Sequence, residues 1–127
     1  MTPRSTLRIL CVDDDVHVLA LLSDALAAEG YDVQTALDGA HALQKIALGD
    51  RPYDVMNVDA QMPDLDGCRF IMQARAGGYD RKIIVFSAHL DEDHVERYQG
   101  LKVDRLIEKP PGRGELVRVV RELADEM

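Results

Sequence analysis

The sequence predicts an α/β protein in which five strands alternate with five helices around one doubly wound parallel sheet. Three observations indicate this class. Short apolar runs recur along the chain, as expected for the buried strands of a parallel sheet. Each run is followed by a stretch in which apolar residues recur at helical spacing. The links between them are short, which favours right-handed crossovers and helices on both faces of the sheet.

The predicted strands are the apolar runs themselves. The first run, LRILCV, ends abruptly in three aspartates, and the third, DVMNV, is also followed by an aspartate. The fourth run, IIVF, is followed by Ser87, so polar side chains stand where several strands end. In chain order, the predicted strands cover residues 7–12, 31–36, 54–58, 83–86 and 103–107.

Helices are predicted after each of these strands. An aspartate of the 13–15 run can cap the first helix, and Gly30 ends it. The turn-rich segment 62–67 opens the third helix, and the helix predicted over 91–99 has only a weak apolar face. Apolar residues at helical spacing mark the inner faces of the first, second, third and fifth helices. In chain order these residues are Val18, Leu19, Leu22, Ala25 and Leu26; Leu43, Ile46 and Ala47; Phe70, Ile71 and Ala74; and Leu116, Val119, Val120 and Leu123.

Composition and charge exclude several classes of function. No linker or repeat divides the 127 residues, so we expect a single domain over 1–127 with no output domain after it. The formal net charge of −8 argues against direct binding of nucleic acid or an anionic membrane. No apolar stretch could span a bilayer and the N-terminus has no signal-peptide core, which predicts a cytoplasmic protein. Cys11 and Cys68 lack metal-ligand spacing and are expected to be packing residues.

Reactive side chains follow four of the predicted strands. The strands lead to Asp13–Asp15, Asp59, Ser87 and Lys109, and ligands bind at the carboxyl ends of open α/β sheets. Several carboxylates in one cleft repel one another unless a cation neutralises them, and Mg²⁺ suits an oxygen-rich site completed by water and phosphate. The pattern therefore predicts Mg²⁺ as cofactor, with Asp59 as a nucleophile that accepts a phosphoryl group beside Lys109 and Ser87.

Four motifs, in this order, give the chain a family resemblance. They are ILCVDDD at 9–15, DVMNVDAQMPDLDG at 54–67, VFSA at 85–88 and EKP at 108–110. Each motif is weak alone, but their order and spacing are specific. Over nearly its whole length the chain resembles the receiver domain of two-component response regulators.

The resemblance implies a fold, an activity and partners. The fold would be flavodoxin-like, with strand order 2-1-3-4-5. The domain would be a self-phosphorylating and self-dephosphorylating switch rather than an enzyme. Its phosphoryl group would come from a sensor histidine kinase or a histidine phosphotransfer protein of a phosphorelay, and phosphorylation would switch the binding of a downstream protein.

The resemblance also implies roles for the metal-site residues. Asp14 would bind Mg²⁺ directly and Asp13 through water, while Asp15 is expected to cap the following helix. Asp59 matches the phosphorylated residue of the family. Gln61 would offer its backbone carbonyl to the metal.

The residues around the phosphoryl group follow the family pattern as well. Ser87 matches the switch Ser/Thr, and the small Ala88 leaves room for the phosphoryl group. Lys109 matches the family's lysine, and Lys109–Pro110 is expected to be a cis peptide. Gln61 and His89 stand where the family tunes hydrolysis, so we expect them to set the lifetime of the acyl phosphate.

Two residues depart from the family pattern. Leu106 stands where many receivers have Tyr or Phe as a rotating switch, and Pro111 stands where the family often has Phe. These differences predict an output surface that does not use the common aromatic mechanism. Asn57 is also unusual, because a polar side chain two residues before Asp59 points to the same side of the strand and needs hydrogen-bond partners.

Two other functions compete with the switch. A haloacid dehalogenase-type phosphatase would use Asp13-x-Asp15, but His17 stands where that family has Thr or Val, and Asp59 would have no role. A phosphorylation-independent, receiver-like interaction module is the alternative that Leu106 keeps open. The sequence does not determine which kinase, which downstream partner or whether a homodimer is involved.

Overall fold

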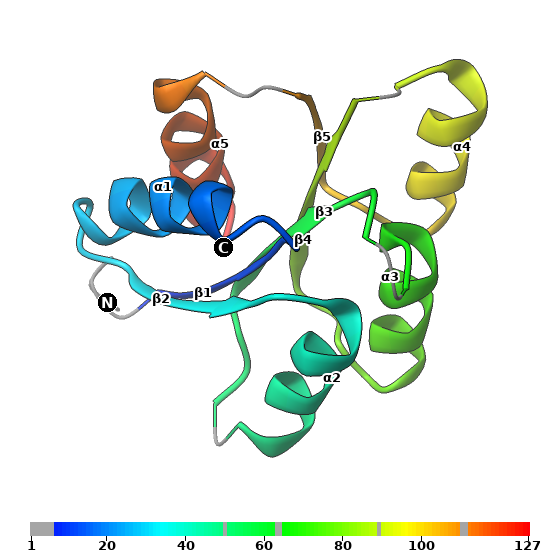
Figure 1. The fold of residues 1–127 in the computed structure, drawn as a ribbon, viewed down its shortest axis with the longest axis horizontal. Coiled ribbons are helices and arrows are strands. Elements are labelled where there is room, and N and C mark those ends of the chain that lie inside the picture. Colours follow the sequence, from blue (N-terminus) through cyan, green and yellow to red (C-terminus); the bar gives the residue numbers. More distant parts are fainter. Residues whose placement is uncertain (1–6, 50, 63–64, 89, 110–111) are drawn as a thin grey trace.

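The computed structural model describes residues 7–49, 51–62, 65–88, 90–109 and 112–127, in which strands and helices alternate (Figure 1). The strands are β1 Arg8–Val12, β2 Asp32–Ala36, β3 Val55–Asp59, β4 Lys82–Ser87 and β5 Arg105–Glu108. The helices are α1 Val16–Ala27, α2 Gly39–Leu48, α3 Gly67–Ala76, α4 Glu92–Gly100 and α5 Arg113–Asp125. Within the described ranges, the predicted set of five strands and five helices is confirmed.

The five strands of the described chain form one parallel sheet in the order β2-β1-β3-β4-β5, as the resemblance implied. In the register, Val12 lies beside Val58, Asp59 beside Phe86, and Ser87 beside Glu108. The central strands therefore end almost level with one another. The residues that follow them emerge at one edge of the sheet.

Two apolar layers cover the sheet, and alternate strand residues belong to different layers. In Figure 1, α1 and α5 lie together on one side, and α2, α3 and α4 lie on the other. The α1/α5 side buries Ile9, Val55, Ile84, Leu26 and Val120 among others. The opposite side buries Leu10, Met56, Ile83, Phe70 and Tyr98 among others.

Aspartate side chains cap the N-termini of four of the helices. Asp15 accepts hydrogen bonds from the backbone N–H groups of His17 (2.9 Å) and Val18 (3.3 Å), which confirms it as the cap of α1. Asp38, Asp66 and Asp91 cap α2, α3 and α4 in the same way. Each such cap stabilises its helix by about 1 kcal/mol. Past the end of α1, Gly30 adopts a positive φ of 92°, a conformation that glycine tolerates better than other residues.

The helix α4 packs against the rest of the domain through fewer buried side chains than the neighbouring helix α3 does. Among its described residues, Tyr98 is the one buried side chain, which agrees with the weak apolar face that the sequence predicted. No helix among the described residues is long and apolar enough to cross a bilayer.

Candidate functional site

Asp59 occupies the last position of β3, and its side chain is only 2% exposed. Its Oδ1 accepts hydrogen bonds from the ammonium of Lys109 (2.5 Å) and from the backbone N–H of Gln61 (3.1 Å). Lys109 follows β5, fifty residues further along the chain. The fold thus brings the predicted phosphoryl acceptor and the predicted lysine into direct contact.

Two more carboxylates lie beside Asp59. One oxygen from each of Asp13, Asp14 and Asp59 can be chosen so that all three lie within 4.8 Å of one another. Asp13 is buried and accepts a hydrogen bond from the Asp15 N–H at 2.9 Å, whereas Asp14 is exposed. The pKa of Asp13 is raised to about 6, mainly by burial and to a lesser extent by the charges of Asp59 and Asp14. The hydrogen bond from the Asp15 N–H and the charge of Lys109 oppose this rise.

Ser87 ends β4 with its side chain fully buried, and its Oγ accepts a hydrogen bond from the Gln61 amide nitrogen at 3.3 Å. Backbone hydrogen bonds fix the strand ends around it. The Ala60 N–H donates to the Phe86 carbonyl (2.9 Å), and the Lys109 N–H donates to the Ser87 carbonyl (3.0 Å). The four predicted positions Asp13, Asp59, Ser87 and Lys109 are therefore set by the ladder of the sheet and not by long loops.

Gly67 allows the β3–α3 loop to pack tightly against this site. A Cβ atom at residue 67 would lie 2.9 Å from the Cα of Ala60 and 3.0 Å from the carbonyl oxygen of Asp59. The Gly67 N–H donates to the Ala60 carbonyl at 3.0 Å. The glycine is needed because the backbone approaches the end of β3 too closely for any side chain.

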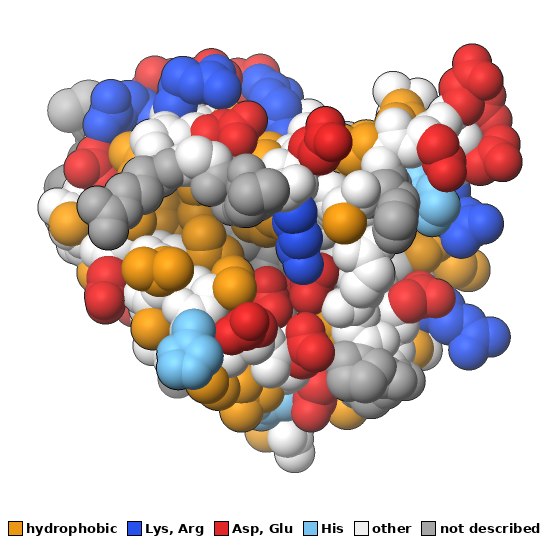
Figure 2. Space-filling model, turned by 45° about the horizontal axis from the view of Figure 1, so that its top comes forward, with side chains coloured by type: hydrophobic (Ala, Val, Ile, Leu, Met, Phe, Trp, Pro, Cys, Tyr) orange, Lys and Arg blue, Asp and Glu red, His pale blue; other side chains and the backbone are white. Residues whose placement is uncertain are grey.

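The charges of this site do not balance. Figure 2 shows acidic side chains near the middle of this face, beside a basic side chain. Among the described residues, three carboxylates face the ammonium of Lys109, and the oxygen atoms that converge here are the ligands that hard divalent cations prefer. The residues therefore fit Mg²⁺ better than Zn²⁺, which favours sulfur and nitrogen ligands.

Several residues for which the sequence predicts a role lie near the site in the chain, and some of them fall outside the described residues. His89, Pro110 and Pro111 lie outside the described residues, and with them the expected cis peptide. Leu106 is half-buried and packs against the α2–α4 side of the core, where it fills space rather than forming a polar contact.

Asn57 points to the α1/α5 side of the sheet, one pleat below Asp59. Its amide nitrogen donates to the sulfur of Cys11 at 3.3 Å, across the register pair that joins β1 to β3. Its Oδ1 is buried without a hydrogen-bond partner among the described residues. Burial raises the pKa of the Cys11 thiol to about 11, so Cys11 is an inert packing residue, as predicted.

The sequence did not predict a groove next to the acidic site. A cavity of about 560 Å³ runs between the β3–α3 loop and α4, and it shares Asp14 and Gln61 with the site. Cys68 from α3 lies in it, and α4 contributes Arg97 and Tyr98. The helical spacing of the 91–99 segment could have shown that residues 94, 97 and 98 share a face, but not what that face meets.

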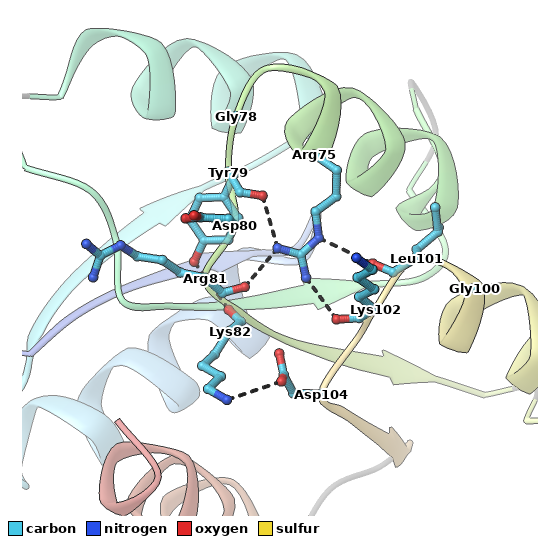
Figure 3. A pocket seen from close by; sticks show the side chains of 10 residues that line it. All are labelled: Arg75, Gly78, Tyr79, Asp80, Arg81, Lys82, Gly100, Leu101, Lys102 and Asp104. Carbon is cyan, nitrogen blue, oxygen red and sulfur yellow. Dashed lines mark hydrogen bonds and ion pairs between the residues drawn. The ribbon is translucent and has the colours of Figure 1, made fainter.

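A second cavity, of about 590 Å³, lies at the opposite end of the sheet (Figure 3). The Arg75 guanidinium at its centre donates to four backbone carbonyls, those of Tyr79, Arg81, Leu101 and Lys102, at 2.9–3.3 Å. Lys82 pairs with Asp104 across the same cavity. These contacts fasten the α3–β4 loop to the α4–β5 loop, which is a structural arrangement.

Comparisons with known proteins agree with this geometry. The sequence profile of the family described as "Response regulator receiver domain" matches residues 9–121. The transcriptional regulatory protein PrrA of Mycobacterium tuberculosis is 41% identical over 118 residues, which are 91% of this chain and 49% of PrrA. The chain spans about half the length of the curated relatives it matches.

Solved structures give the same result. The response regulator TrrA of Thermotoga maritima, solved in complex with Mg²⁺-BeF, is 31% identical with a TM-score of 0.79, covering 93% of this chain and 99% of TrrA. A CheY-like receiver domain protein of Methanospirillum hungatei is 27% identical with a TM-score of 0.86, covering 94% of each chain. The strand order is that of flavodoxin-like α/β proteins, and the carboxylates at the carboxyl edge of the sheet agree with the receiver class within that fold. The chain belongs to the response regulator receiver domain family of two-component signalling.

Proposed function

We propose that this receiver domain accepts a phosphoryl group on Asp59 in a Mg²⁺-dependent reaction and thereby changes its binding of a downstream partner. The donor would be a sensor histidine kinase or a histidine phosphotransfer protein, and the reaction would take place in the cytoplasm. One observation carries the proposal, namely the contact between the buried Asp59 carboxylate and Lys109, beside the carboxylates of Asp13 and Asp14.

The metal would be held by carboxylates from two strand ends. Asp14 and Asp59 would bind Mg²⁺ directly, Asp13 would act through water, and Gln61 would contribute its backbone carbonyl. When bound, Mg²⁺ neutralises charge between the acidic pocket and an incoming phosphoryl group. The Mg²⁺-BeF complex of the related TrrA supports Mg²⁺ as the metal.

Phosphoryl transfer would form one bond and break one. A carboxylate oxygen of Asp59 attacks phosphorus as the bond from phosphorus to the donor's leaving group breaks. Both hydrogen bonds that Asp59 accepts from described residues reach Oδ1, so Oδ2 is the oxygen that these residues leave available for attack. Lys109 offers its ammonium to the phosphoryl oxygens, where negative charge is concentrated.

Ser87 would detect the phosphoryl group. Its hydroxyl accepts a hydrogen bond from Gln61 and can donate its own proton to a phosphoryl oxygen. Water would later cleave the acyl phosphate and restore Asp59, so the domain acts as a timed switch and not as an enzyme with an external product. Gln61 and His89 are expected to set that lifetime.

The test is phosphorylation of the purified chain with acetyl phosphate and Mg²⁺. The chain has no tryptophan, so the reaction is best followed by intact mass. We expect a gain of one phosphoryl group that requires Mg²⁺ and is absent in Asp59→Asn. The matched control is Asp24→Asn, because Asp24 is an exposed aspartate of α1 and should remain as reactive as the wild type.

A phosphorylation-independent interaction module is the second candidate. Leu106 favours it, because this half-buried apolar residue has no ring that could swing toward Ser87. If folded wild-type chain gained no phosphoryl group while Mg²⁺ binding was demonstrated, this second function would replace the first.

A further inference from the structure

We infer that Arg97 binds the acyl group of a small acyl phosphate donor in the groove between the β3–α3 loop and α4, making Arg97 a determinant of donor specificity. This inference rests on the proposed function and deepens it. The groove is the cavity of about 560 Å³ that shares Asp14 and Gln61 with the acidic site. Its size is within the range of small-molecule sites, about 300–1,000 Å³.

The groove opens next to the reacting carboxylate. Gln61 lines it, and the Gln61 N–H donates to Oδ1 of Asp59. Tyr98 lines it from α4, and burial raises the pKa of Tyr98 to about 12, with smaller contributions from the charges of Cys68, Asp66 and Asp59. A donor whose phosphorus is held at Asp59 would therefore have room for its leaving group in the groove.

Arg97 is the one Lys or Arg among the described residues that line the groove. Two carboxylates, Asp14 and Asp66, line it as well, so an anion could enter only where a cation offsets them. Arg97 is exposed on α4 and lines the groove together with Cys68. Burial raises the pKa of the Cys68 thiol and the charge of Arg97 opposes this shift, which places the guanidinium near Cys68. The other basic group, His94, already shares its Nδ1 with Asp91 at 2.7 Å.

The chemistry of the leaving group identifies the kind of donor. With an acyl phosphate, the new Asp59–phosphorus bond replaces the bond from phosphorus to the acyl oxygen, and the acyl group leaves as a carboxylate without needing a proton. The planar fork of a guanidinium matches a carboxylate and stabilises the charge that develops on it. With phosphoramidate, the leaving group takes a proton and departs as neutral ammonia, which offers a guanidinium no anion.

The experiment compares two donors on the same chain. Initial rates of Mg²⁺-dependent phosphorylation by acetyl phosphate and by phosphoramidate are measured by intact mass for the wild type, Arg97→Ala and Arg97→Lys. We expect Arg97→Ala to slow acetyl phosphate about tenfold, the effect of losing one charge-assisted contact, and phosphoramidate by less than about twofold. Arg97→Lys should recover only part of the loss, because an ammonium lacks the fork.

Arg118→Ala is the matched control. It removes one arginine from an exposed position of α5, where Arg118 pairs with Glu122, and should leave both rates within about twofold. Equal slowing of both donors by Arg97→Ala, or slowing of neither, would overturn the assignment of Arg97 while the proposed function stood. Wild-type chain that reacted with neither donor would overturn the proposed function and this inference together.

Discussion

The two ends of the parallel sheet hold charged side chains in opposite ways. At the carboxyl end, within the part of the chain that the structure describes, three carboxylates face one ammonium, that of Lys109. At the amino end, the Arg75 guanidinium donates to four carbonyls (Figure 3). Two of its cationic neighbours, Arg81 and Lys82, each have a carboxylate partner. The cavity at the amino end is slightly larger. Cavity size therefore does not locate the function here, whereas the convergence of three like-charged carboxylates does.

This comparison assigns a stabilising role to one end and a chemical role to the other. The Arg75 contacts join loops that are far apart in the sequence, and breaking them should cost stability without affecting chemistry. The acidic cluster gathers like charges, and removing one should relieve repulsion while weakening chemistry. Substitutions at the two ends should therefore have opposite consequences.

The largest loss of stability is expected from Arg75→Met. The variant keeps an apolar stem but removes four hydrogen bonds, which should lower the free energy of unfolding by about 2–4 kcal/mol in urea titrations. Phosphorylation per folded molecule should not change. The exposed Arg118→Met is the control, with an expected loss below about 0.5 kcal/mol. Equal losses of unfolding free energy in the two variants would show that the Arg75 contacts between the two loops do not stabilise the fold.

The next largest effect is expected from Gly67→Ala, which tests how tightly the β3–α3 loop packs on the acidic end. The added methyl group would lie 2.9 Å from the Cα of Ala60, so the loop must shift, at a cost of about 1–3 kcal/mol. Chemical denaturation measures the loss. Gly114→Ala in α5 is the matched control, because a methyl group there meets open space and should be neutral or slightly stabilising.

A pH-dependent effect of up to about 3 kcal/mol is expected at Asp13. Its folded pKa of about 6 lies above the usual value, so folding favours the protonated form. The stability contributed by protonated Asp13 is complete below about pH 4 and is lost as the pH rises through 6. Asp13→Asn keeps the acceptor for the Asp15 N–H and should therefore exceed the wild type in stability at pH 7 without metal, but not at pH 4.

Unfolding of Asp13→Asn and the wild type across this pH range checks the prediction. Asp24→Asn is the control for removing a carboxylate, and its difference from the wild type should stay flat. A difference between Asp13→Asn and the wild type that was constant from pH 4 to pH 7 would contradict the account of repulsion and burial at this end.

The smallest effect is expected from Asn57→Val, just below the acidic cluster. Valine removes a buried acceptor that has no partner among the described residues, at the loss of a weak contact with Cys11. The free energy of unfolding should rise by about 1 kcal/mol or less. A loss of several kcal/mol in denaturant titrations would mean that the Asn57 oxygen is satisfied in solution.

The fold could be predicted from the sequence because local patterns and strand ends agree. Apolar runs ending at Asp59 and Ser87 defined both the sheet and its reactive edge, and residues after parallel strands share that edge whatever the details of packing. Asp15 was recognisable as a cap because helix starts need side-chain acceptors.

The features that the sequence did not predict depend on contacts between segments that are distant in the chain. Nothing local reveals that Arg75 meets carbonyls up to 27 residues away, or that Arg97 and Cys68 line the same groove. The partner of Asn57 was equally hidden, because it depends on the register between β1 and β3. Such contacts arise from packing, which a single sequence does not display.

The most direct test of the central claim is calorimetric titration of Mg²⁺ into the wild type, Asp14→Asn and Arg75→Met. Because three carboxylates converge at the carboxyl end, removing one of them should weaken Mg²⁺ binding about tenfold or more. Folded Arg75→Met should bind Mg²⁺ within about twofold of the wild type. Equal affinities in the wild type and Asp14→Asn would contradict the claim that the acidic edge is the chemical end of this domain.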